Sequence, residues 1–124
     1  MRVIALWVLP AVAAAITLAV PGQRVGRWRV GVLVAVAAAH LALVATLWLV
    51  PAPPALGGWM AADALGLIVL TLTSILFFLT ALYTVGYLRR ERPRGGRVFV
   101  GGLLGFLAAT SVVALSQHLA MLWV

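Results

Sequence analysis

The sequence predicts an all-α, polytopic transmembrane protein with four helical spans. Composition is the first observation, because 65% of the 124 residues are hydrophobic and only 9% are charged, whereas an ordinary soluble domain is about one-quarter charged. The length of the apolar stretches is the second observation. A transmembrane span needs roughly 20 mostly apolar residues, and stretches of this length account for nearly the whole chain. We therefore treat 1–124 as a single transmembrane domain, with spans at about 3–20, 28–50, 63–88 and 98–118.

The first span, 3–20, contains Pro10, which removes a backbone hydrogen bond and is expected to kink the helix. Pro21 ends the span. An alternative is a secretory signal peptide, with Arg2 as its charged region and 11–13 as its cleavage site. The apolar run of 18 residues exceeds a usual signal core of about 7–15 residues, so we favour a membrane span.

The second span, 28–50, ends at Pro51, and a loop rich in proline and glycine follows without any charge. Trp28 and Trp48 fall near the two ends of this span, where indole rings favour the membrane interface. The third span begins at Asp63, whose carboxylate is expected to cap the free N–H groups of the helix start.

The fourth span is too long for one simple crossing. From Val98 to Val124 there are 27 residues without a formal charge, which would make a helix of about 40 Å against a hydrocarbon core of about 30 Å. Either one helix extends beyond the core, or the chain turns near 116–118 and begins a fifth span at Leu119.

Arginine placement predicts the orientation. Three arginines lie in the loop after the first span and five in the loop after the third, whereas the middle loop has no basic residue. By the positive-inside rule both basic loops are cytoplasmic and the N-terminus lies outside, with Arg2 as the one count against this. We expect a multi-pass protein of the cell inner (plasma) membrane.

Few side chains offer chemistry. His40, in the middle of the second span, and His118, near the end of the fourth, are ionisable residues at membrane depth, and such groups are candidates for a proton path because burying them is costly. Asp63 is a further candidate at the interface. The alternative is structural: a histidine that hydrogen-bonds a neighbouring helix, and an aspartate that caps its own. The two histidines differ in depth, which argues against axial haem ligation.

Two further patterns concern helix packing. Gly101 and Gly105 form a G-x-x-x-G pair on the fourth span, and small residues at this spacing let helices approach closely. On the third span, Thr73, Thr80 and Thr84 fall near one face. Their hydroxyls either line a water chain or bond to their own backbone carbonyls.

Composition excludes several classes of function. The absence of cysteine excludes disulfides, thiolate metal sites and cysteine nucleophiles within this chain. We predict no catalytic residues, no cofactor and no metal, because the chain has no phosphate loop, no Ser-His-Asp set and no pair of carboxylates. The net charge of +7 is explained by orientation in the membrane rather than by nucleic-acid binding.

The third and fourth spans carry a family resemblance. The stretch 59–66 (WMAADALG) leads into the third span, which closes with 81–88 (ALYTVGYL), and the fourth closes with 111–124 (SVVALSQHLAMLWV). This pattern resembles the antiporter-like subunits of respiratory complex I, of Mrp-type cation/proton antiporters and of hydrogenase-4-type membrane complexes. The last stretch is most similar to the hydrogenase-4 type, where Asn-Asn-Leu-x-x-Leu-Trp-Val opens the fifth helix. Gly66 stands where serine is usual, and Gln117-His118 where Asp-Asn or Asn-Asn is usual.

The resemblance implies proton or cation translocation, with this chain similar to the N-terminal part of a much longer subunit. The Glu and Lys that form the family's conducting pair lie on its fifth and seventh helices and have no counterpart here, so only Asp63 and His118 occupy motif positions. Other membrane subunits are the implied partners, besides the lipid bilayer, and the complex could be a membrane oxidoreductase. In that family the N-terminus of the subunit lies outside, which is the orientation that the arginines in the loops of this chain predict.

Two function hypotheses follow. The first is a proton- or cation-translocating module of a multi-subunit respiratory, hydrogenase or antiporter complex. The alternative is a non-conducting assembly subunit of such a complex, favoured by the lack of an acidic or lysine side chain within the spans. A stand-alone multidrug exporter of similar length would need a membrane-embedded Glu in its first helix, which this sequence lacks.

Overall fold

The protein is a bundle of antiparallel helices. The computed structural model describes residues 1–21, 27–90 and 96–117. Within them the α-helices are α1 (Arg2–Ala19), α2 (Arg27–Leu49), α3 (Ala64–Arg90) and α4 (Gly96–Leu115), with a short 3₁₀ turn, η1 (Leu56–Gly58), between α2 and α3. All 4 α-helices are long and apolar enough to cross a membrane. The prediction of an all-α protein with four spans is confirmed.

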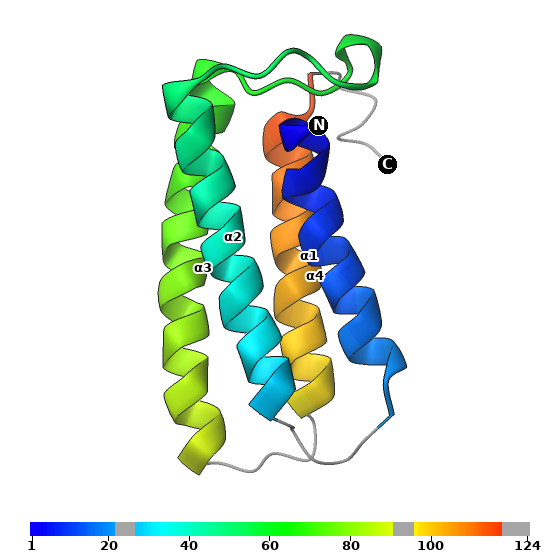
Figure 1. The fold of residues 1–124 in the computed structure, drawn as a ribbon, viewed down its shortest axis with the longest axis vertical. Coiled ribbons are helices and arrows are strands. Elements are labelled where there is room, and N and C mark those ends of the chain that lie inside the picture. Colours follow the sequence, from blue (N-terminus) through cyan, green and yellow to red (C-terminus); the bar gives the residue numbers. More distant parts are fainter. Residues whose placement is uncertain (22–26, 91–95, 118–124) are drawn as a thin grey trace.

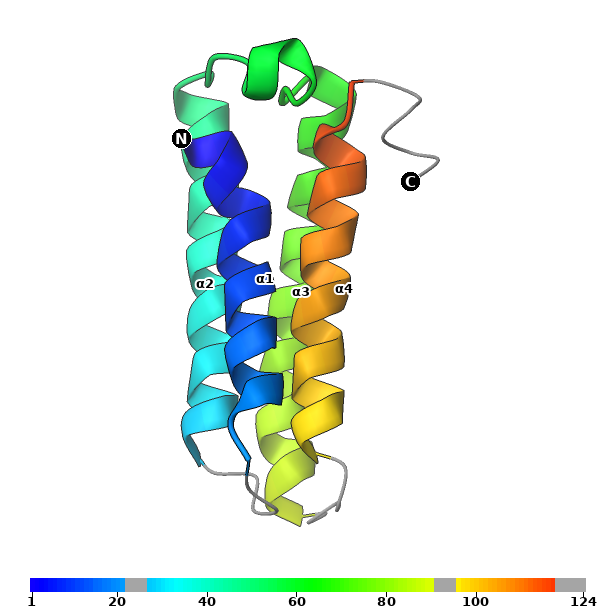
Figure 2. The same cartoon turned by 90° about the vertical axis from the view of Figure 1, so that its right-hand side faces the viewer.

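The four helices run side by side with alternating direction (Figures 1 and 2). The most extensive packing joins α1 to α4 and α2 to α3, and further contacts join these two pairs into one bundle. The segment between α2 and α3 crosses one end of the bundle, where the N-terminus also lies (Figure 1). The opposite end is the one at which α2 and α4 begin and α3 ends.

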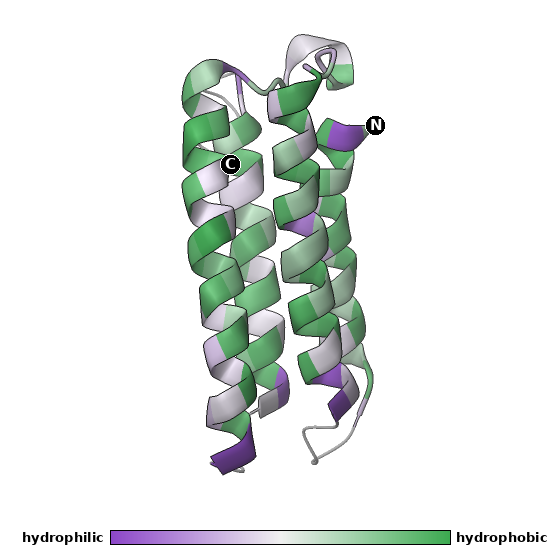
Figure 3. Ribbon diagram, turned by 60° about the vertical axis from the view of Figure 1, so that its left-hand side comes forward, coloured by the Kyte–Doolittle hydropathy of each residue, from purple (hydrophilic) through white to green (hydrophobic). Residues whose placement is uncertain are grey.

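Apolar side chains cover the outside of the bundle as well as its interior. Leu72, Ile75 and Leu79 of α3 are all exposed, and the hydrophobic colouring continues along the helices with polar residues gathered mainly at their ends (Figure 3). A helix that is hydrophobic all round belongs in a membrane rather than at a water-exposed surface. The bundle is therefore built to be embedded in lipid.

The interior contains two clusters of buried apolar residues, each drawing on all four helices. One includes Leu33, Phe77 and Leu104 and lies toward the arginine-rich end, which is the end where α2 and α4 begin and α3 ends. The other includes Leu6, Leu70 and Leu115 and lies toward the opposite end. The middle of α2 lies between them.

The loop before α3 and the end of α4 are bound together. Ser116 and Met60 form an isolated antiparallel bridge. The Ala61 N–H donates to the Leu115 carbonyl at 3.0 Å, and the Gln117 N–H donates to the Trp59 carbonyl at 3.0 Å. These bonds replace the helical ones, so α4 ends at Leu115 rather than at 118. The chain thus leaves the helix where the sequence allowed a turn, and the fifth span that could follow lies outside the described residues.

Close to this junction, α3 and α4 approach each other through a glycine. A Cβ atom built at Gly66 would lie 2.5 Å from the backbone oxygen of Ala114 and 2.5 Å from Oδ1 of Asp63. Neither distance is compatible with a side chain at this position, so glycine permits the close packing of the α3 start against the α4 end.

Arginine side chains bind the carboxyl-terminal ends of neighbouring helices. Arg2 donates from Nη1 to the Val50 carbonyl at 3.0 Å and to the Thr46 carbonyl at 3.3 Å. Arg29, which is only 1% exposed, donates from Nη2 to the Val20 carbonyl at 2.8 Å. The last carbonyls of a helix lack intrahelical partners, and a cation is favourable there. This contact gives Arg2, the arginine that counted against the predicted orientation, a local structural role.

Candidate functional site

A histidine bridge occupies the centre of the bundle. His40 of α2 is 1% exposed. Its Nδ1 lies 2.8 Å from the Ser74 hydroxyl of α3, and its Nε2 lies 2.9 Å from the Ser111 hydroxyl of α4. Ser74 and Ser111 are themselves buried. One imidazole ring therefore connects three helices through hydrogen bonds at both of its nitrogens.

The direction of these hydrogen bonds follows from the serine on α4. The Ser111 hydroxyl donates to the Leu107 carbonyl at 2.8 Å, and a hydroxyl has only one hydrogen to donate. It must then accept from Nε2–H of His40, so Nδ1 is left as the acceptor for the Ser74 hydroxyl. We infer the neutral Nε2–H tautomer, with every polar atom of the bridge paired.

The same arrangement accommodates a charged ring without rearranging heavy atoms. When a proton is added at Nδ1, both ring nitrogens become donors, and both serine oxygens can accept from them. Imidazole can take up a proton at one nitrogen and release one from the other, which is why histidine can relay protons. The geometry thus permits two roles for His40: a structural side chain that connects helices through hydrogen bonds, and a proton relay.

The sequence pointed to His40 but not to its partners. The alternatives for His40 were a proton path and a hydrogen bond to a neighbouring helix, and the structure places it in hydrogen bonds to two helices. Ser74 and Ser111 were visible only as polar residues within apolar spans. Depth could have selected Ser74, which lies in the central part of α3, but it would not have selected Ser111, which is among the last five residues of α4.

Asp63 has a capping geometry. Its Oδ1 accepts a hydrogen bond from the Gly66 N–H at 2.8 Å, and its backbone carbonyl accepts from the Leu67 N–H at 2.8 Å. A side-chain oxygen that binds an N–H three residues later is the usual N-cap arrangement. The structure therefore places Asp63 at the end of the bundle as the cap of α3, away from the histidine bridge. His118 lies outside the described residues.

The two glycines of the G-x-x-x-G pair have different surroundings. A Cβ at Gly101 would lie 2.6 Å from the Leu18 side chain of α1, whereas a Cβ at Gly105 would meet nothing within 4 Å in the part of the chain that the structure describes. The close approach between α1 and α4 therefore involves Gly101.

Threonine hydroxyls on α3 bind their own helix. Thr80 donates to the Leu76 carbonyl and Thr84 to the Thr80 carbonyl, each at 2.8 Å. Thr71 makes the same type of bond to Leu67 at 2.6 Å. Of the two expectations, a water chain or a bond to the backbone four residues earlier, the geometry of Thr80 and Thr84 corresponds to the second. Thr73 makes no such bond to the described residues.

Comparisons with known proteins add no family to this geometry. No protein-family model, curated protein or solved structure matches the chain. Among residues 1–21, 27–90 and 96–117, no group of three or more His, Cys, Asp or Glu side chains is placed to hold a metal ion. The histidine bridge is therefore the candidate site on which a functional argument rests.

Proposed function

We propose that the chain is a membrane-embedded module of a multi-subunit proton- or cation-translocating complex of the respiratory, hydrogenase or antiporter type. The observation that carries the proposal is His40, a titratable side chain in the core of a membrane-spanning bundle with a hydroxyl on each ring nitrogen. Ionisable groups at membrane depth are costly and are typical of ion pathways and proton relays. The resemblance of 59–124 to antiporter-like subunits supports the same function.

The arginine distribution supports the orientation. The described arginines at the helix ends, Arg27, Arg29, Arg89, Arg90 and Arg97, lie where α2 and α4 begin and α3 ends, and the uncharged segment between α2 and α3 lies at the other end of the bundle (Figure 1). In this proposal the arginine-rich end is cytoplasmic, the N-terminus is outside, and the membrane is the cell inner (plasma) membrane.

Partner subunits complete the module in this proposal. The helices α1 to α4 contain no acidic or lysine side chain that would pair with His40, so in this proposal the charged conducting residues come from other helices. The exposed apolar faces of α3 and α4, which include Leu72, Leu79 and Phe106, are surfaces on which such helices could pack.

A second candidate function is a non-conducting assembly subunit of the same kind of complex. The observation that favours it is the completeness of the bridge: both nitrogens of His40 already bind serine hydroxyls, as expected for a histidine whose task is to hold helices together. In that case the ring would keep its neutral form throughout.

Two substitutions of His40 separate these functions. His40→Gln keeps one hydrogen-bond donor and one acceptor but cannot carry a proton, whereas His40→Leu removes all the hydrogen bonds. Each variant replaces the native chain in cells, assembly is followed on native gels, and proton transport is followed in membrane vesicles with a pH-sensitive dye.

A relay predicts that His40→Gln assembles normally and loses proton transport. A purely structural bridge predicts that His40→Gln keeps both assembly and transport, while His40→Leu weakens assembly. Normal assembly and normal transport in both variants would contradict both functions of the bridge.

A further inference from the structure

The arginine-rich end of the bundle contains a pocket between α2 and α3. Its volume is about 590 Å³, and it is lined by Arg27, Val30, Val85, Leu88 and Arg89. Arg27 is the first residue of α2, and Arg89 is in the last turn of α3. Because the two helices are antiparallel, residues far apart in the sequence bring two positive charges to one pocket.

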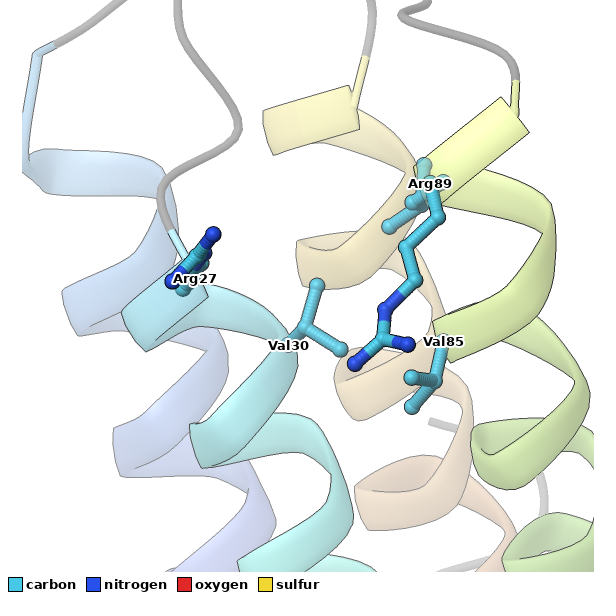
Figure 4. A pocket seen from close by; sticks show the side chains of 5 residues that line it. Arg27, Val30, Val85 and Arg89 are labelled. Carbon is cyan, nitrogen blue, oxygen red and sulfur yellow. The ribbon is translucent and has the colours of Figure 1, made fainter.

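The pocket is amphipathic. Figure 4 shows Arg89 extending back along α3, so that its guanidinium lies between the side chains of Val30 and Val85. Arg27 lies across from it at the start of α2 (Figure 4). Both arginines are exposed, while Val30, Val85 and Leu88 are partly buried. The Arg89 guanidinium therefore lies at the level of the apolar side chains, so that charged and apolar groups line the same pocket.

Arg27 and Arg89 differ from Arg2 and Arg29, two other arginines placed at helix ends. Arg2 and Arg29 bind carbonyls at the ends of neighbouring helices. Arg27 and Arg89 make no hydrogen bond or ion pair to another described residue, so their guanidinium groups remain available to a ligand within this part of the chain.

We propose that this pocket binds an anionic phospholipid. The lipid phosphate lies between Arg27 and Arg89, and the part of an acyl chain nearest the headgroup lies against Val30, Val85 and Leu88. Guanidinium groups bind phosphate oxygens through charge-assisted, often bidentate hydrogen bonds. A pocket at the end of a membrane span lies at headgroup depth, and basic pockets between transmembrane helices suit lipid headgroups. The mixed lining distinguishes a lipid from a free anion, because a free phosphate would leave the apolar wall unused.

This inference requires only that the bundle is embedded in a membrane, and it holds whether or not the module conducts protons. It also gives the arginines a second role. Besides setting the orientation, they would fix the α2–α3 pair to a lipid in the leaflet at the arginine-rich end.

Native mass spectrometry of the purified full chain in mild detergent tests the proposal. The probes are phosphatidylglycerol and phosphatidylcholine with identical acyl chains, titrated separately. The test variant is Arg27→Gln/Arg89→Gln. The matched control is Arg90→Gln/Arg97→Gln, which removes the same charge at the same end of the bundle from residues that do not line the pocket.

We expect one phosphatidylglycerol molecule to bind the native chain in preference to phosphatidylcholine. The test variant should bind it about tenfold to thirtyfold more weakly, as expected for two cations near a lipid surface, and the control should bind nearly as the native chain does. Equal loss in both double variants, or no preference between the lipids, would overturn the proposal.

Two additional measurements cover misfolding and the identity of the ligand. Val85→Phe keeps every charge but narrows the pocket, so it should weaken phosphatidylglycerol binding several-fold while circular dichroism shows unchanged helix content. Undiminished binding in this folded variant would contradict the placement of the acyl chain. Inorganic phosphate at millimolar concentration should displace little of the lipid, and full displacement would show a small-anion site instead.

Discussion

Gly66→Ala should separate the start of α3 from the end of α4. The new Cβ would lie 2.5 Å from the Ala114 oxygen and 2.5 Å from Asp63 Oδ1. The first atom belongs to the backbone and cannot move unless α4 moves. Overpacking of this kind costs about 1–3 kcal/mol, and turning the Asp63 carboxylate away would cost about a further 1 kcal/mol in lost capping. We expect the free energy of unfolding to fall by about 2–4 kcal/mol.

The assay is unfolding by sodium dodecyl sulfate in mixed micelles, followed by far-ultraviolet circular dichroism. Gly86→Ala is the matched control, because it lies on the same helix and a Cβ there would meet nothing within 4 Å among the described residues. It should be neutral or stabilising by up to about 1 kcal/mol, since alanine favours a helix. Equal effects of Gly66→Ala and Gly86→Ala would refute the close approach of the two helices.

The remaining predictions use the same unfolding assay or the transport assay. Gly101→Ala should cost about 1 kcal/mol or less, because the atoms it meets belong to a movable leucine side chain, and Gly105→Ala should not destabilise. A loss at Gly105 as large as at Gly101 would contradict this. Ser74→Ala and Ser111→Ala should each cost about 0.6 kcal/mol, the average for hydrogen bonds between membrane helices, and at most about 1.7 kcal/mol; no loss in either would disprove the bridge. His118→Asn should leave proton transport nearly unchanged, because the family that the chain resembles has an amide near this position, and a large loss of transport would refute that reasoning.

The gross fold could be predicted from the sequence because the membrane requires it. Backbone groups in a bilayer must be paired internally, so long apolar stretches become helices, and prolines such as Pro51 mark where they end. The N-cap at Asp63 could also be predicted, because capping depends on residues only three positions apart.

The partners of His40 could not be predicted in the same way. In a soluble bundle a polar stripe shows which face of each helix points outward, but α2 and α3 carry apolar residues on all sides. Their rotation about their own axes is therefore not readable from the sequence. Which hydroxyls meet the imidazole depends on that rotation, and so Ser74 and Ser111 remained two polar residues among several.

The end of α4 was hard to predict for a related reason. The bridge between Met60 and Ser116 joins residues that are distant in the sequence. The residues around Ser116 do not show that the loop before α3 will pair with it. Gly66 is a similar case. The α4 backbone that occupies the space of a side chain at Gly66 belongs to a segment distant in the sequence.

The most direct test of the central claim is purification of the tagged chain in mild detergent, with mass spectrometry of the proteins that remain bound. We predict stoichiometric recovery with antiporter-, hydrogenase- or quinone-oxidoreductase-like membrane subunits that supply the conducting Glu and Lys. Recovery of the chain alone, as a monomer or a homo-oligomer, would contradict the claim that it is a module of a translocating complex.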